Sequence, residues 1–315
     1  MLLMPEVLTM IILNLIFALF GLVAFVFSLR IYLNWNINAT TQLQYQLEKQ
    51  SFLASTIIKF IFSIKIPLFL FFIFTLDKIS NVIMGAMCAA GVVDATKYGT
   101  YLIILKILNL YFFAFWLKIN KEDLREKNQP YTKQKFLLFC ILFLFLIAEI
   151  VLETLMFSGI KVDKIVSCCG SIYSSTANSA ISSIFLLDKS ALLAIFYGNY
   201  LLMPILYFFK NRYMFAVVNL VFIATSLISL ILFFGTYIYE LPSHHCPFCF
   251  LQSDYYFVGY PIYSLLFVGT FYGLSVGFTK QLAKNYKMSL LFNSLYVILV
   301  SLFAIIYYFT NGVLL

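Results

Sequence analysis

Long apolar runs alternate with short polar segments along this chain. A helix needs about 20 mostly apolar residues to cross a hydrocarbon core of roughly 30 Å. Eight runs reach that length, so the pattern predicts an all-α integral membrane protein, a bundle of about eight transmembrane helices. The expected spans are 7–29, 56–76, 98–117, 136–157, 190–209, 214–239, 255–278 and 288–309. Lys59, Lys65 and Pro67 interrupt the second run, and seven helices or a re-entrant segment near 79–96 are the alternatives.

The composition agrees with this pattern. Of the 315 residues, 63% are hydrophobic and 11% are charged, whereas a soluble domain carries about 25% charged residues. This excludes a water-soluble globule, and no polar segment is long enough for a second domain, so we expect one domain over 1–315. The formal charge of +8 lies mostly in short loops, where it indicates topology and contact with lipid headgroups rather than nucleic acid.

Lys and Arg residues are distributed unequally between the two sets of loops. Thirteen lie on one side and five on the other. Because cytoplasmic loops carry the excess of positive charge, the richer side is expected to be cytoplasmic and both termini to face outward. We expect the inner (cytoplasmic) membrane of a bacterium, with outer loops 77–97, 158–189 and 240–254 facing the periplasm.

The cysteines follow the same division. Five of the six lie in the expected outer loops, and Cys140 lies inside a predicted helix. Disulfides persist on the outer side of the membrane, so the distribution predicts sulfur chemistry there. The outer cysteines are Cys88, Cys168, Cys169, Cys246 and Cys249.

The densest local motif is His244-His245-Cys246-Pro247-Phe248-Cys249. A C-x-x-C pair can form an easily reduced disulfide, and neighbouring imidazoles favour the thiolate, so the motif suits thiol–disulfide exchange. The same four side chains, His244, His245, Cys246 and Cys249, also offer nitrogen and sulfur ligands for zinc or copper. A structural disulfide that holds the loop is the third interpretation.

The motif extends into a resemblance to a known family. Cys246-x-x-Cys249-Phe250-x-Gln252 opens a predicted membrane helix, and Tyr260-Pro261 follows it. This segment of about sixteen residues resembles the C-x-x-C-aromatic-x-Gln segment of DsbB-type bacterial membrane oxidoreductases, which generate disulfides.

The resemblance implies a site and a partner. Cys246 and Cys249 would pass electrons to a quinone held beside them, and a second outer cysteine pair would take electrons from a soluble periplasmic thiol protein. The residues expected around the quinone are Phe250, Gln252, Tyr255 and Tyr256.

Two further groups of sulfur residues lie in the outer loops. Cys168 and Cys169 are adjacent and could be the substrate-facing shuttle, thiolates of a metal site, or members of static disulfides, including one to Cys88. Met84, Met87 and Cys88 are spaced to share one face of a short helix. Soft sulfur ligands select Cu(I), although methionines at this spacing also serve packing.

Ionisable residues lie inside the predicted spans. Lys106 and Glu149 are equally far from the outer ends of successive antiparallel helices, so we expect them to pair, because an unpaired charge at that depth costs several kcal/mol. Glu153 lies one turn from Glu149 on the same face. The group is either a structural ion pair or a proton relay.

These observations support three functions. The first is a quinone-linked thiol–disulfide oxidoreductase on the outer face, and the alternative is a copper- or zinc-binding or transporting membrane protein. The second alternative is a structural subunit of a membrane complex. Phe250 follows Cys249, so no C-x-x-C-H motif exists for covalent c-type haem.

Overall fold

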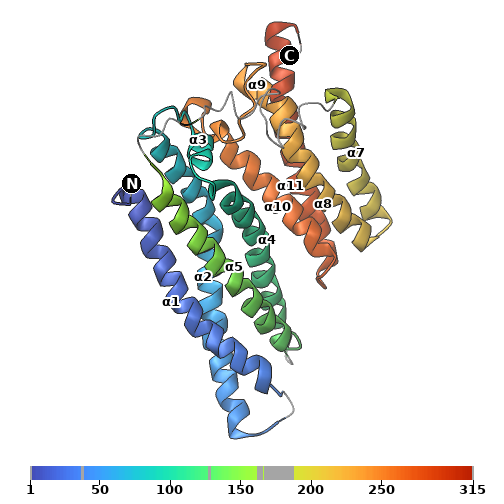
Figure 1. The fold of residues 1–315 in the computed structure, drawn as a ribbon. Helices are drawn as coiled ribbons and strands as arrows, with labels where there is room; N and C mark the ends of the chain where they lie inside the picture. The colour runs from blue at the N-terminus through green and yellow to red at the C-terminus, as the bar shows by residue number, and fades with distance from the viewer. Residues whose placement is uncertain (1, 37–38, 127–128, 162–165, 167–187, 314–315) are drawn as a thin grey trace. The chain divides into compact units, whose positions relative to one another are not determined.

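The computed structural model describes residues 2–36, 39–126, 129–161, 166 and 188–313. Of the described residues, 81% are helical and none is in a strand, which confirms the all-helical prediction (Figure 1). The α-helices are α1 (Pro5–Asn34), α2 (Gln42–Ser80), α3 (Ala89–Asp94), α4 (Gly99–Asp123), α5 (Thr132–Gly159), α7 (Lys189–Phe208), α8 (Arg212–Ser229), α9 (Gly235–Tyr239), α10 (Gly259–Val276) and α11 (Leu282–Asn311). A π-helical turn, η2 (Leu230–Phe234), joins α8 to α9, and two 3₁₀ turns, η3 (Cys249–Leu251) and η4 (Ser253–Tyr255), precede α10.

Within the described residues, seven helices are long and apolar enough to cross a membrane. They are α1, α2, α4, α5, α7, the continuous helix Arg212–Tyr239 and α11. The expected eighth span, 255–278, corresponds to α10, which has 18 residues because Tyr255 belongs to η4 and residues 256–258 form a turn. The length and composition of these seven helices indicate an integral membrane protein in contact with lipid.

Helix α2 is much longer than the predicted span 56–76. It has 39 residues, and at 1.5 Å per residue it extends about 58 Å. Its first turns are rich in Gln, Glu and Lys, which are good helix formers, so the helix continues beyond the apolar run. Its N-terminal part therefore extends past the length needed to cross a bilayer core.

Local signals end or begin several helices. The Asp188 carboxylate accepts hydrogen bonds from the backbone N–H groups of Ser190 and Ala191 at the start of α7. The Asn211 side chain accepts one from the Met214 N–H at the start of α8. Helix α11 ends at Asn311, and the next residue, Gly312, has a φ of 72°, a left-handed conformation that favours glycine.

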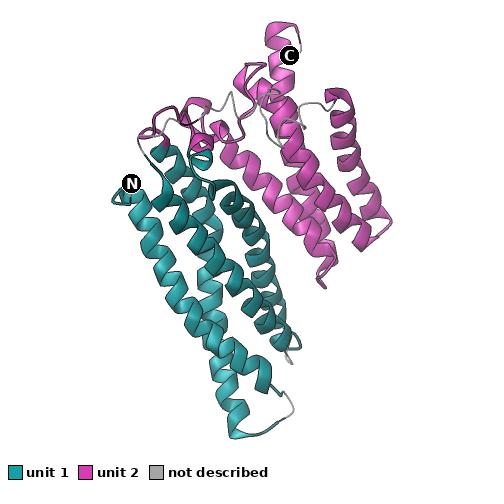
Figure 2. Cartoon of the chain, viewed as in Figure 1, with its two compact units in different colours: residues 1–79, 92–164 teal, residues 80–91, 165–315 magenta. Residues whose placement is uncertain are grey.

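The described chain divides into two compact units, shown in different colours in Figure 2. Unit 1 comprises Met1–Ile79 and Val92–Lys164, and unit 2 comprises Ser80–Gly91 and Ile165–Leu315. The single domain expected from the sequence stays a prediction.

Each unit has its own aromatic core. In unit 1, Phe62 of α2 stacks on Phe113 of α4 with ring centroids 4.2 Å apart and meets the edge of Trp116. In unit 2, Phe196 of α7 stacks on Phe222 of α8 at 5.5 Å. These contacts hold the helices of each unit together.

Candidate functional site

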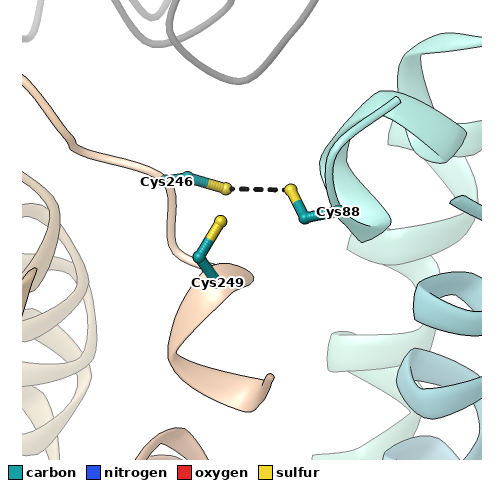
Figure 3. Close-up of side chains that lie close together, drawn as sticks. All are labelled: Cys88, Cys246 and Cys249. Atoms are coloured by element: carbon teal, nitrogen blue, oxygen red, sulfur yellow. Dashed lines mark hydrogen bonds between the residues drawn. The ribbon is translucent and has the colours of Figure 1, made fainter. Parts of the chain in front are cut away.

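Three cysteines of unit 2 meet at one point, and we call them the thiol cluster: Cys88, Cys246 and Cys249. Their sulfur atoms all lie within 4.8 Å of one another, and the Sγ atoms of Cys88 and Cys246 are 3.5 Å apart in a thiol hydrogen bond. Figure 3 shows the three side chains directed toward one another. Cys88 lies 158 residues before Cys246, so the fold creates this cluster.

The thiol cluster is shielded from solvent. The exposed fractions of Cys88, Cys246 and Cys249 are 0%, 1% and 4%. All three belong to the hydrophobic core of unit 2, together with Phe250. Thiols are tolerated there because an uncharged Cys behaves as a small apolar residue.

The loop that carries Cys246 is anchored by its backbone and neighbours. Helix α9 ends where Glu240 adopts a left-handed conformation with φ of 54°. The Tyr239 hydroxyl donates a hydrogen bond to the Cys246 carbonyl. The Tyr263 hydroxyl donates one to the Pro247 carbonyl at 2.6 Å.

The π-helical turn η2 supplies a further anchor. A π-turn interrupts the regular ladder of an α-helix and is frequent near functional sites. Here the carbonyl of Ile231 lies 2.9 Å from Nδ1 of His245. The loop before Cys246 is therefore tied back to the helix that precedes it.

Aromatic rings form one wall of the site. Tyr239 stacks on Phe250 with centroids 4.6 Å apart and meets Tyr255 edge-on at 4.6 Å. A Cβ atom at Gly259 would lie 2.9 Å from the Cβ of Phe250, so only glycine permits this approach of α10. The rings exclude water from the sulfur atoms beside them.

The segment that carries Cys88 is held to the same loop. The Gln252 side-chain amide donates a hydrogen bond to the Met87 carbonyl at 3.2 Å. The expected helical face of Met84, Met87 and Cys88 is wrong, because Met84 lies in a turn and Met87 in a segment without regular secondary structure before α3 begins. Both thioethers are exposed, and only Cys88 turns inward.

The two histidines flank the cluster without joining it. Neither imidazole belongs to the group of mutually close ligand atoms formed by the three sulfurs. The ring of His244 packs edge-on against Tyr239 at 4.3 Å, and its Nε2 is buried without a hydrogen-bond partner. Burial lowers the pKa of His244, although nearby Cys88 opposes this, and burial also lowers the pKa of His245. Both imidazoles are therefore neutral at pH 7.

The residues expected around a quinone are divided between the interior and the surface. Phe250 is buried, and Tyr255 lies against the same rings. Burial, followed by the Cys249 sulfur, raises the pKa of Tyr255, so its hydroxyl stays protonated. Tyr256 is 93% exposed. The expectations for Cys168 and Cys169 fall outside the described residues.

A second buried cluster lies in unit 1, and the expected ion pair is confirmed there. The Lys106 ammonium lies 2.8 Å from Glu149 and 2.6 Å from Glu153. The Lys65 ammonium is 3.1 Å from Glu149 and donates to the Asn14 amide oxygen at 2.8 Å. Asn14 in turn donates to Glu153 at 2.9 Å.

These ion pairs and hydrogen bonds form a closed cycle. We call its five residues the ion-pair ring: Asn14, Lys65, Lys106, Glu149 and Glu153. Asn109 adds a hydrogen bond to Glu149 at 2.6 Å. The contributions of Asn14, Lys65 and Asn109 were not predicted. The sequence signal that could have identified these three residues is a polar side chain inside an apolar run.

Comparison with known proteins adds no assignment. No family model matches the chain, and neither a curated protein nor a solved structure matches it. The resemblance to DsbB-type oxidoreductases therefore stays an expectation that rests on one short motif.

Chemically, the thiol cluster suits two kinds of reaction. A metal–sulfur bond is about 2.3 Å long, so two thiolates on one tetrahedral ion lie about 3.8 Å apart. The Cys88–Cys246 separation of 3.5 Å is close to that value and longer than a disulfide bond of about 2.05 Å. The three sulfurs could hold one soft metal ion or exchange a disulfide.

Proposed function

We propose that this membrane protein binds a soft metal ion, Zn²⁺ or Cu⁺, through the thiolates of Cys88, Cys246 and Cys249. The observation that carries the proposal is the convergence of three sulfurs within 4.8 Å from two distant segments of the chain. Thiolates are the ligands that select these ions over harder cations. A disulfide would use only two of the three sulfurs.

The burial of the cluster also favours a metal. Three thiolates close together in an apolar core repel one another and are poorly solvated, so a bound cation is needed to balance them. In contrast, exchange with a soluble protein requires an accessible sulfur, and each of the three is almost fully buried.

The proposal is tested on the full chain purified in detergent under reducing conditions. After loading with Zn²⁺ or Cu⁺ and desalting, mass spectrometry of the metal content should find one ion per chain. Cys88→Ser, Cys246→Ser and Cys249→Ser should each retain less than a tenth of it. Cys140→Ser is the matched control, because this buried cysteine lies in α5 of unit 1.

Two results would contradict the proposal. A wild-type chain that retains no metal would contradict metal binding altogether. Full metal retention by Cys88→Ser would contradict a three-thiolate site, because Cys88 is the residue that distinguishes this site from a simple C-x-x-C pair.

The fourth ligand decides between the two ions. Cu⁺ is stable with three thiolates, whereas Zn²⁺ in a structural site takes four ligands. His244 stands two residues before Cys246 with a buried Nε2 that has no partner. We therefore expect His244→Ala to weaken Zn²⁺ binding more than Cu⁺ binding, and equal loss of both would exclude it as a ligand.

A quinone-linked oxidoreductase is the second candidate, and the sulfurs of Cys246 and Cys249, which lie within 4.8 Å of each other, favour it as a pair that could close a disulfide. In this reaction, the Cys246 and Cys249 thiols release two electrons and two protons as they join in a disulfide. A quinone accepts both and becomes a quinol. Phe250 and Tyr255 would form the adjacent aromatic wall.

This second candidate is tested with metal-free, pre-reduced protein and a soluble quinone analogue. It predicts one quinol formed per chain, and none with Cys249→Ser. A chain that holds metal and leaves the quinone unchanged supports the metal site. A chain that does neither favours the structural subunit.

We also propose that the thiol cluster faces the periplasm of a bacterial inner membrane. The support is the excess of Lys and Arg in the opposite set of loops. A C-terminal alkaline phosphatase fusion should then be active, and a C-terminal fluorescent-protein fusion that fluoresces instead would reverse the orientation.

A further inference from the structure

The sulfurs of the thiol cluster are nearly inaccessible to an arriving metal ion. All three cysteines are almost fully buried, and Cu⁺ prefers sulfur ligands to water. A cuprous ion therefore reaches such a site by exchange from one ligand to the next rather than as a hydrated ion. An exposed sulfur in the same part of the chain would be a suitable first ligand.

Two exposed thioethers lie in the same short segment as Cys88. Met84 is 56% exposed, and Met87, which directly precedes Cys88, is 72% exposed. Both lie between α2 and α3, outside the seven helices that are long and apolar enough to cross a membrane. Leaving them exposed forfeits the stabilisation that burial of an apolar side chain gives. Their position beside a buried thiol points to a role for their sulfurs.

The backbone of this segment is held in place. The Met84 carbonyl accepts a hydrogen bond from the Val166 N–H at 3.1 Å, and the Met87 carbonyl accepts one from the Gln252 side-chain amide at 3.2 Å. Gly85, between them, has a φ of 87°, a left-handed conformation that favours glycine. Within the described part of the chain, neither thioether takes part in a hydrogen bond. The segment therefore presents two uncommitted sulfur ligands on an anchored backbone.

The side chain of Met87 bridges the short step from the surface to Cys88. These residues are consecutive, so their Cα atoms are about 3.8 Å apart. A methionine side chain has three rotatable bonds. Rotation about these bonds changes the distance between the thioether and the Cys88 thiol without moving the anchored backbone.

A thioether differs from a thiol in its protons and in the ions that it binds. It carries no acidic proton, so it takes a cation without releasing one, whereas a thiol must first lose its proton. Thioethers are good ligands for Cu⁺, whereas zinc sites in proteins use thiolate, imidazole and carboxylate ligands. The two exposed methionines therefore favour the arrival of Cu⁺ over that of Zn²⁺.

We infer that Cu⁺ enters the thiol cluster through Met84 and Met87, which take it from a soluble cuprous complex and transfer it to Cys88. This inference rests on the proposed metal site and identifies Cu⁺ as its ion. In the first step, the bond from copper to the donor ligand breaks as a bond to a thioether forms. In the second, Cys88 loses its proton to water and its sulfur replaces the thioether. Copper stays in the cuprous state throughout, and no electron is transferred.

The test compares rates of metal loading on the full, metal-free chain in detergent without oxygen. Stopped-flow absorbance follows Cu⁺ as it leaves its coloured bicinchoninate complex, and a coloured zinc–dye complex serves for Zn²⁺. The double variant Met84→Leu with Met87→Leu should load Cu⁺ roughly tenfold more slowly and load Zn²⁺ at the wild-type rate. Its final metal content should equal that of the wild type, because the thiol cluster is unchanged. Met87→Leu alone should slow loading more than Met84→Leu alone, because Met87 adjoins Cys88.

Met214→Leu is the matched control. This methionine is also exposed, at 52%, but it lies in the first turn of α8. Along that helix it is about 25 Å from Ile231, whose carbonyl contacts His245 beside the thiol cluster. The control should load both ions at the wild-type rate. Leucine is close to methionine in volume, so thermal unfolding of every variant should match the wild type.

The outcomes separate the entry route from the proposed site. Loading of Cu⁺ by the double variant at the wild-type rate would overturn the route and leave the thiolate site standing. Equal slowing of Cu⁺ and Zn²⁺ would also overturn it, because the cause would then be an altered segment rather than lost thioether ligands. A wild type that retains Zn²⁺ but not Cu⁺ would overturn the route alone, and one that retains neither ion would overturn both the route and the site.

Discussion

The ion-pair ring of unit 1 and the thiol cluster of unit 2 both lie among apolar helices, but they are balanced differently. The ring contains two lysines and two glutamates, and each charge has an opposite charge within 3.1 Å. Its positive and negative charges balance, so the ring needs no ligand to be neutral. The thiol cluster is neutral while protonated and needs a cation only when its sulfurs ionise.

This difference separates a structural role from a ligand-dependent one. Each charged member of the ring leaves an uncompensated charge in the membrane interior if it is removed. Each thiol can be replaced without leaving a charge, so its loss affects binding more than folding. Four predictions test the comparison.

The largest effect is expected for Glu149→Gln. This change leaves the ammonium groups of Lys65 and Lys106 with one remaining carboxylate, and breaking a buried pair in this way costs about 3–5 kcal/mol. Unfolding of the detergent-solubilised protein measures the loss. Glu126→Gln, an exposed position of unit 1, should change stability by less than about 0.5 kcal/mol.

Cys246→Ser should separate binding from stability. We expect at least a hundredfold loss of metal affinity, which corresponds to about 2.8 kcal/mol. Unfolding of the metal-free variant should shift by less than about 1 kcal/mol, because serine is similar in size and leaves no charge. Metal-free destabilisation equal to that of Glu149→Gln would contradict the proposed difference between the units.

The double variant Glu149→Gln with Lys106→Met should be more stable than Glu149→Gln alone. Removing both partners leaves Lys65 and Glu153, which remain bridged by Asn14, so the site is neutral again. A double-mutant cycle should give a coupling of about 1–3 kcal/mol. Additive losses would show that Lys106 and Glu149 do not act as a pair.

The smallest effect is expected for Tyr239→Phe. It removes the hydrogen bond to the Cys246 carbonyl, at a cost of about 1 kcal/mol in stability. Loss of such a supporting contact should lower metal affinity roughly tenfold. Tyr255→Phe is the control, because the Tyr255 ring contacts Tyr239 without that hydrogen bond.

Parts of both clusters could be predicted. Lys106 and Glu149 were expected to pair because they lie at matching depth on successive helices, and depth follows directly from sequence position. Lys65 and Asn14 join the same ring, but their rotation about the helix axes depends on packing. In an almost uniformly hydrophobic run, no polar face indicates which side of the helix packs inward, so the rotation of the helix about its axis cannot be predicted.

The sequence by itself determined the helical membrane fold, because a chain so rich in apolar residues can satisfy its backbone in lipid only through internal hydrogen bonds. It also identified the C-x-x-C pair, whose two sulfurs are neighbours by covalent spacing. Only the tertiary structure brought Cys88 to that pair, kept both histidines out of the sulfur group and turned Met84 and Met87 outward. Contacts between distant segments arise from the packing of several helices and loops at once, and no local pattern encodes them.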